Sequence, residues 1–137
     1  MLSAQPVHAA QDKLDDLAAI KPAIDRLPRQ SNWNSIEIEK AERRGYSLTL
    51  WYREQAFISQ AEAQADSQAI VRAVLTALVA QGRFPADQRV TVFVSAMRRF
   101  RGETGKAMVN WYGIASYDYN RDAVRYEECT GKSWFGC

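Results

Sequence analysis

The sequence contains a single histidine, and this scarcity excludes most of the catalytic machinery that small proteins use. His8 lies in the N-terminal stretch of the 137-residue chain, and the only cysteines are Cys129 and Cys137. A Ser-His-Asp or Cys-His arrangement therefore has no base in the body of the chain. A zinc site would have one histidine and two cysteines, far apart in sequence. We accordingly expect no enzymatic activity, no metal and no cofactor.

Long apolar runs are absent and the net charge is small. No apolar run approaches the roughly 20 residues that a helix needs to cross a bilayer. The formal net charge of +2 neither requires nor excludes a polyanionic partner. The apolar fraction of 47% and the charged fraction of 25% are ordinary for a globular protein. We therefore expect one α+β domain that spans residues 12–137.

Residues 1–11 match the end of a signal peptide but not its beginning. Val7, His8 and Ala9 have the small-x-small pattern that precedes a signal-peptidase cut, and Pro6 lies just upstream. The basic region and the apolar core of a signal peptide are missing. Two interpretations stay open, a signal-peptide remnant and a disordered tail of small residues.

The two cysteines bear on the same question. Cys129 and Cys137 flank a short loop with two glycines, and they allow one intramolecular pairing. A disulfide between them would indicate an oxidising compartment, whereas two free thiols would suit the cytosol. Together with the N-terminal pattern, the cysteines favour an extracytoplasmic protein, either periplasmic or secreted.

Residues 59–82 give the strongest helix signal in the chain. Ser59 and Glu62 have the spacing of a capping box, which satisfies free N–H groups in the first turn. Gly82 is suited to the left-handed conformation that ends a helix, and Pro85 prevents its continuation. Apolar residues at helical spacing form one wide stripe: Ile70, Val71, Val74, Leu75, Ala77, Leu78 and Val79.

Alternating apolar and polar residues predict five strands around this helix, at residues 36–39, 46–53, 89–100, 107–119 and 123–128. Residues 12–27 predict an N-terminal helical arm, kinked or split by Pro22, and residues 28–34 a loop. The resulting order, β-β-α-β-β-β, predicts an α+β fold of two layers. A mainly antiparallel five-stranded sheet would be packed by one long amphipathic helix.

Within residues 107–119 the alternation puts Trp111, Gly113 and Tyr117 on one face and Tyr112 on the other. The small side chains of that first face, at Gly113 and Ala115, leave room for a close neighbour. The long helix is the simplest candidate for that neighbour.

Four basic residues surround the predicted turn after residue 100. Arg98, Arg99, Arg101 and Lys106 lie close in sequence to aromatic residues, as in surfaces that contact nucleic acid. The alternative is a solvated hairpin tip whose long side chains cover the sheet edge. The small total charge favours this second interpretation.

Aromatic residues with polar tips are concentrated in the C-terminal third. We consider Tyr117, Tyr119, Trp134 and Phe135 as partner-binding residues, because such side chains bury much area at interfaces. If the cysteines pair, Trp134 and Phe135 lie in a tethered loop that presents a preorganised anchor. Alternatively, this loop folds back and caps the sheet.

These features favour a non-catalytic extracytoplasmic domain that acts through protein–protein interaction. An envelope or secretion-apparatus component, an inhibitor and an immunity factor all fit this class. The first alternative is a nucleic-acid-binding module that uses the hairpin at residues 98–106. The second is a small enzyme without histidine. The expected partner is another protein, and the sequence does not identify it.

Overall fold

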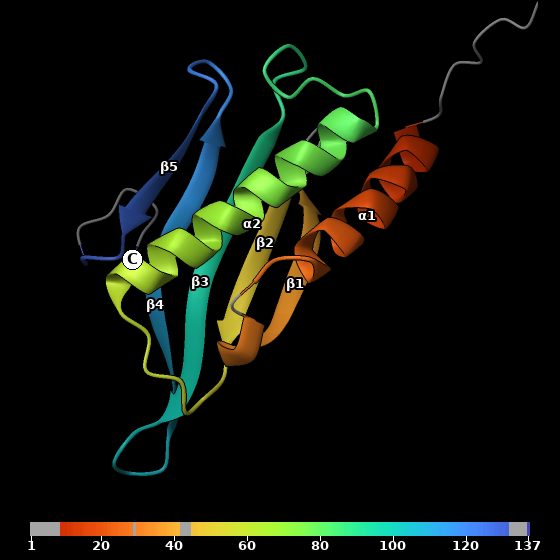
Figure 1. The fold of residues 1–137 in the computed structure, drawn as a ribbon. Helices are drawn as coiled ribbons and strands as arrows, with labels where there is room; N and C mark the ends of the chain where they lie inside the picture. The colour runs from red at the N-terminus through yellow and green to blue at the C-terminus, as the bar shows by residue number, and fades with distance from the viewer. Residues whose placement is uncertain (1–8, 29, 42–44, 132–136) are drawn as a thin grey trace, which may run out of the picture.

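The computed structural model places two helices against one face of a five-stranded sheet (Figure 1). The structure describes residues 9–28, 30–41, 45–131 and 137. The elements are α1 (Ala9–Asp25), a 3-10 turn (Gln30–Asn32), β1 (Trp33–Ala41), β2 (Gly45–Tyr52), α2 (Gln60–Ala80), β3 (Thr91–Arg101), β4 (Ala107–Asp118) and β5 (Ala123–Glu128). The predicted two-layer α+β fold is confirmed.

The strands lie in the sheet in chain order, from β1 at one edge to β5 at the other. The pairs β1–β2, β3–β4 and β4–β5 are antiparallel, and β2–β3 is parallel. The parallel pair arises because α2 carries the chain back across the sheet between β2 and β3, so that Gly45 lies opposite Thr91. The prediction of a mainly antiparallel sheet is confirmed.

Both ends of α2 are fixed by local hydrogen bonds. The Ser59 hydroxyl accepts from the Glu62 N–H at 3.1 Å, and the Glu62 carboxylate accepts from the Ser59 N–H at 3.3 Å. At the other end Gly82 has a φ of 78°, and the N–H groups of Gly82 and Arg83 each donate to carbonyls of the last turn at 2.9 Å. The predicted capping box and glycine terminus are therefore both present.

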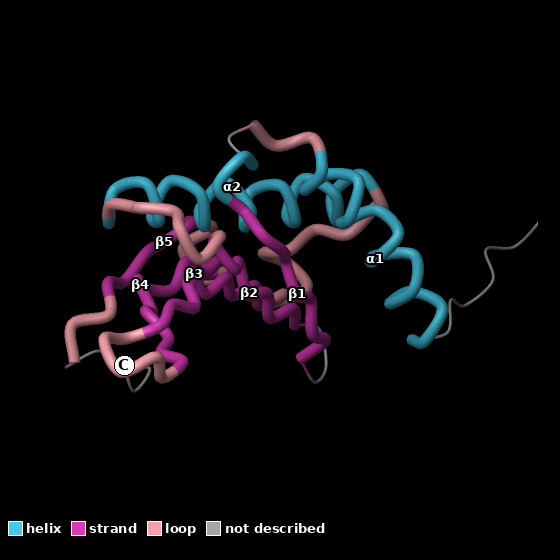
Figure 2. Tube along the Cα trace, turned by 90° about the horizontal axis from the view of Figure 1, so that it is seen from below, coloured by secondary structure: helices cyan, strands magenta, loops and turns pink. Residues whose placement is uncertain are grey.

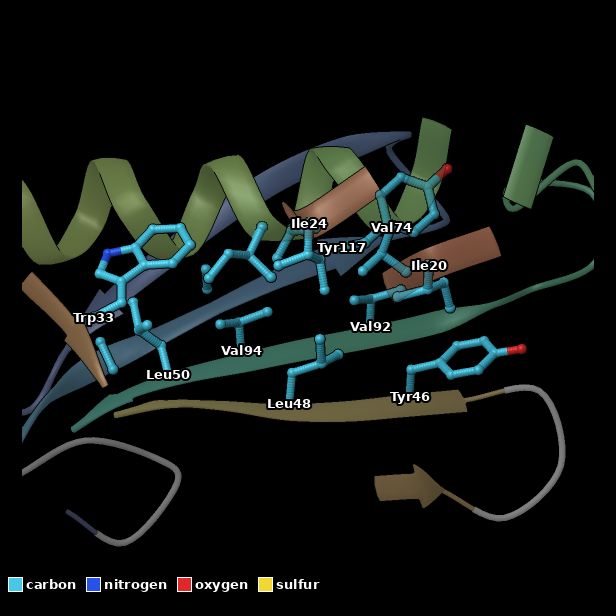
Figure 3. Packing of buried hydrophobic residues seen from close by; sticks show 14 of the residues in the cluster. Ile20, Ile24, Trp33, Tyr46, Leu48, Leu50, Val74, Val92, Val94 and Tyr117 are labelled. Carbon is cyan, nitrogen blue, oxygen red and sulfur yellow. The ribbon is translucent and has the colours of Figure 1, made fainter. Parts of the chain in front are cut away.

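The hydrophobic core lies between the helices and the face of the sheet beneath them. Leu48, Leu50, Val92 and Val94 point from β2 and β3 toward the helices (Figure 3). The helices contribute fully or almost fully buried residues to the same cluster, namely Ile20, Ile24, Ile70, Val71, Val74 and Leu78. Most of the apolar stripe predicted for residues 59–82 thus packs on the sheet, whereas Val79 at its end is 50% exposed.

The helix α1 runs through Pro22 without ending, so the predicted split into two short helices is wrong. It also begins at Ala9 rather than at Asp12. A proline inside a helix removes one backbone hydrogen bond and costs about 3 kcal/mol. Ile20 and Ile24 are buried on either side of Pro22 and hold both halves of α1 against the core. Their burial offsets this cost.

The first strand is longer than predicted. Residues 28–34 were expected to form a loop, but β1 begins at Trp33, which lies opposite Tyr52. An irregularity in the pairing between Trp33 and Ser35 follows, and the regular alternation begins at Ser35. Trp33 is only 7% exposed. The burial of Trp33 favours a strand at this position, although the polar composition of residues 28–34 alone indicated a loop.

A bulge in β4 changes which of its residues face the helices. Ala96 lies opposite Gly113 while the next residue, Met97, lies opposite Trp111, so Tyr112 is the extra residue. Tyr112 is buried in the core and Trp111 lies on the opposite face. The prediction that Trp111 shares a face with Gly113 is therefore wrong, because a sequence pattern of strict alternation does not reveal a bulge.

Candidate functional site

The basic side chains of the β3–β4 hairpin are divided between the two faces of the sheet. Arg98 lies on the helix side, where its guanidinium donates to the backbone carbonyl of Glu54 at 2.7 Å and to the Tyr112 hydroxyl at 3.4 Å. It also lies over the Phe100 ring, 5.0 Å from the ring centre. Arg98 therefore ties the hairpin to the loop that precedes α2.

Arg99 lies on the opposite face, stacked on Trp51. Its guanidinium carbon is 3.6 Å from the centre of the indole, which is only 8% exposed. Arg101 donates to the backbone carbonyl of Gly105 at 3.0 Å, within the hairpin tip, and Lys106 is exposed. The four cations considered for nucleic-acid contact thus do not form one continuous basic surface.

The two tyrosines considered for partner binding differ in exposure. Tyr117 is 5% exposed, and its hydroxyl donates to the Asp122 carboxylate at 2.5 Å. Burial and this bond to Asp122 together raise the pKa of Tyr117 to about 12. Tyr119 is half-buried and packs against the core. The Tyr117 ring therefore packs largely in the interior.

Cys129 and Cys137 form a disulfide, with their Cα atoms 5.3 Å apart. The bond links the end of β5 to the last residue of the chain, and the Cys129 N–H donates to the Tyr112 carbonyl at 2.9 Å. The predicted pairing is confirmed. Trp134 and Phe135, the proposed anchor residues of the tethered loop, lie outside the described residues.

A buried polar cluster joins the first half of α2 to the sheet. The Tyr52 hydroxyl donates to the Asp66 carboxylate at 2.7 Å, and burial followed by this bond raises the pKa of Tyr52 far above its usual range. The Tyr52 ring meets the Tyr112 ring edge-on at 5.7 Å. Asp66 is only 4% exposed. Sequence reasoning missed this residue, because a single acidic side chain in a helix usually faces solvent.

A second polar contact lies beside the first. The Tyr126 hydroxyl donates to the Gln60 side-chain carbonyl at 2.8 Å, and the Gln60 amide donates to the Tyr112 carbonyl at 2.9 Å. The Tyr126 phenol fills the space that Gly113 leaves on β4. The room predicted at Gly113 is therefore occupied by a tyrosine of β5, not by the helix. These contacts fix the two layers together.

The other face of the sheet is covered by neither of the described helices, since both lie on the same side (Figure 2). We call this the outer face. Over β4 and β5 it is hollowed by a cavity of about 560 Å³, lined in part by Ile114, Ser116, Arg125 and Glu127. Trp51, with Arg99 stacked on it, lies on the same face at β2. The outer face therefore carries both a hollow and a stacked cation–aromatic pair.

A second groove, of about 360 Å³, lies between the C-terminal half of α1 and the edge strand β1. Its lining includes Lys21, Ile24 and Asp25 from α1 and Trp33, Ile36 and Ile38 from β1. The Trp33 indole N–H is buried and has no hydrogen-bond acceptor among the described residues. We call this the β1 groove. Sequence analysis could not foresee it, because it depends on where α1 packs.

Within residues 9–28, 30–41, 45–131 and 137, no three His, Cys, Asp or Glu side chains gather as they would around a metal ion. None of the described helices combines the length and apolarity needed to cross a bilayer. No protein family model, no curated protein and no solved structure matches the chain. Function is therefore inferred from the residues of this chain and their geometry.

Proposed function

We propose that this chain is a non-catalytic extracytoplasmic domain that binds another protein through the outer face of its sheet. The observation that carries the proposal is the one-sided packing of the sheet (Figure 2). Both described helices cover one face, and the opposite face presents half-buried apolar side chains together with a hollow. A sheet surface of this kind gains stability when a partner covers it.

The composition of the outer face supports a protein partner. Apolar and aromatic side chains lie there in positions alternate to the core: Phe93, Met97, Trp111 and Ile114. Arg99 and Trp51 add a stacked pair. Aromatic residues, methionine and arginine are enriched at the centres of protein interfaces, where they bury much area at modest entropic cost. The outer face has all three kinds of residue.

The disulfide supports a location outside the cytoplasm. Bonds such as Cys129–Cys137 persist in oxidising compartments and are rare in reducing ones. An envelope or secretion-apparatus component, an inhibitor and an immunity factor are the classes that combine such a location with a purely binding role. The domain would then act by presenting a rigid surface on a two-layer core.

The alternative is a nucleic-acid-binding module that uses the hairpin at residues 98–106. Arg99 and Arg101 share a face with Trp111, which is the combination of cation and aromatic ring that binds single strands. Against it, Arg98 and Arg101 donate to the chain's own carbonyls. Filter binding at low salt tests this alternative, and retention of labelled DNA or RNA would support it over a protein partner.

Site-specific photocross-linking in the native cell tests the proposed function. A benzophenone amino acid replaces Ser47 or Ser95 on the outer face, or Arg72 or Thr76 on the exposed side of α2 as a matched control. We expect one discrete protein adduct from Ser47 and Ser95, found in the extracytoplasmic fraction. Adducts of equal yield from Arg72, or none from the outer face, would contradict the proposal.

A further inference from the structure

We infer that β1 is a strand-addition site, whose free edge takes an extended segment of a partner protein in which basic residues alternate with apolar ones. This inference rests on the proposed function and specifies how the partner is held. It combines three observations, namely the open edge of β1, the groove beside it and the charge of its outward side chains.

The backbone of β1 is open on one side. β1 is the first strand of the sheet and pairs with β2, and within the described residues no strand pairs with its other edge. It is nine residues long, against six for β5 at the opposite edge. The helix α1 packs on α2 rather than on β1. A row of N–H and C=O groups on such an edge is a template for another strand.

The β1 groove provides room for the side chains of an added strand. It runs beside Ile36 and Ile38, which are half-buried, and the buried Ile24 of α1 lies on its other side. Successive side chains of a strand point to opposite faces, so every second residue of an added segment would enter the groove. The isoleucines at its floor select apolar residues at those positions.

The buried indole of Trp33 supports an occupant for the same groove. Its nitrogen lies on the edge of the ring that points away from Leu50 and Val94 (Figure 3). This N–H is buried without an acceptor, and Trp33 lines the groove. Leaving a buried donor unpaired is unfavourable, whereas an incoming backbone carbonyl would satisfy it.

The negative charge of β1 determines which residues are favoured at the other positions of the added segment. Glu37 and Glu39 are exposed and lie on the outer face, on the positions that alternate with Ile36 and Ile38. Side chains directly opposite each other on neighbouring strands attract when their charges are opposite and repel when they are alike. Lysine or arginine is therefore favoured at every second position of the added strand.

The same charges disfavour a second copy of this chain as the occupant. In an antiparallel pair of two β1 strands centred on Glu37, Ile38 or Glu39, a glutamate of one strand lies opposite a glutamate of the other. Like charges directly opposite each other on neighbouring strands are destabilising. The charge of β1 therefore favours a basic segment of a different protein.

The test uses the full chain labelled with ¹⁵N and a synthetic peptide, Lys-Val-Lys-Ile-Lys-Val-Lys. We expect the peptide to slow hydrogen exchange of the β1 amides and to shift their resonances. A peptide with glutamate in place of lysine, and a lysine peptide methylated on alternate backbone nitrogens, should not bind. Double substitution Glu37→Lys with Glu39→Lys should weaken binding about tenfold. The single charge reversal Glu103→Lys, at the exposed hairpin tip, is the control and should leave binding unchanged.

Three results would overturn the inference: shifts confined to the outer face or the hairpin, equal binding of the methylated peptide, or equal binding of the glutamate peptide. Failure of the inference is separable from failure of the proposed function. If Ser47 and Ser95 cross-link to a partner while β1 stays unprotected, strand addition is wrong and the outer-face proposal stands. If neither surface responds, both are wrong.

Discussion

The Tyr52 hydroxyl donates a 2.7 Å hydrogen bond to the carboxylate of Asp66, and both side chains are buried between α2 and the sheet. The bond joins the last residue of β2 to the first half of the helix that follows it. Removing the hydroxyl deprives a buried carboxylate of a donor. This pair is therefore a polar contact between the two layers whose loss should lower stability.

Tyr52→Phe should lower the free energy of unfolding by about 1–3 kcal/mol, because it removes a hydrogen bond to a buried charged group. Urea denaturation monitored by circular dichroism measures the change. Tyr119→Phe removes a hydroxyl from a half-buried tyrosine and serves as the control. Asp66→Asn combined with Tyr52→Phe should cost less than the sum of the two single changes, and strict additivity would contradict a direct contact.

Stability should fall at alkaline pH. Burial raises the pKa values of Tyr117 and Tyr126 to about 12, whereas a tyrosine of the unfolded chain titrates near 10. The folded state therefore keeps protons that the unfolded chain releases, and the free energy of unfolding decreases between about pH 10 and pH 12. Urea denaturation at several pH values in this range gives the slope of the free energy of unfolding against pH. Tyr117→Phe should make the slope shallower, and an unchanged slope would argue against this assignment.

Gly82→Ala should destabilise the protein by about 1 kcal/mol, because residue 82 adopts a φ of 78° that alanine disfavours. An added Cβ would meet nothing within 4 Å, so the cost is purely conformational. Gly82→Asn should cost less, since asparagine tolerates the left-handed region better. Thermal unfolding compares the three proteins, and equal melting temperatures for the two variants would contradict the conformational explanation.

Gly113→Ala should lower the free energy of unfolding more than Gly102→Ala does. A Cβ at this position would collide with the Tyr126 phenol and the Glu127 backbone carbonyl, and we expect a loss of about 1–3 kcal/mol. Gly102→Ala is the matched control, because there the Cβ meets mainly the flexible side chain of Met108. Denaturation midpoints of both variants test this prediction. It is wrong if Gly102→Ala lowers the free energy of unfolding as much as Gly113→Ala does.

Reduction of the Cys129–Cys137 disulfide should lower the free energy of unfolding by about 2–3 kcal/mol, since the bond closes a short loop. Urea denaturation with and without reductant measures this difference, and the double substitution Cys129→Ser with Cys137→Ser should make the protein insensitive to reductant. Intact mass of the protein from its native source, before and after reduction, tests the location. Free thiols there would contradict an oxidising compartment.

The parts of the fold that sequence analysis predicted correctly depend on local sequence patterns. The limits of α2 follow from Ser59, Glu62 and Gly82, which act within one turn of the chain. The core faces of β2 and β3 follow from alternation at Leu48 and Val92. These signals need no knowledge of distant residues, and the structure agrees with them.

Features that depend on tertiary packing were not predictable in this way. The bulge at Tyr112 breaks the alternation of β4, and the burial of Trp33 extends β1 into a polar stretch. The β1 groove exists only because α1 packs on α2 and stands beside the edge strand. Sequence analysis considered Tyr117 for partner contact because its side chain is aromatic with a polar tip. In the structure its side chain is buried.

The parallel contact between β2 and β3 has a consequence for how the protein folds. The β1–β2 hairpin and the β3–β4–β5 meander each pair neighbours in sequence, and such contacts form quickly. The two halves meet along the β2–β3 pair, from Gly45 opposite Thr91 to Tyr52 opposite Arg98, so the chain between them, α2 included, must close into a loop first. We therefore expect closure of this loop to limit the rate of folding, with α2 joining two units that can each assemble from local contacts.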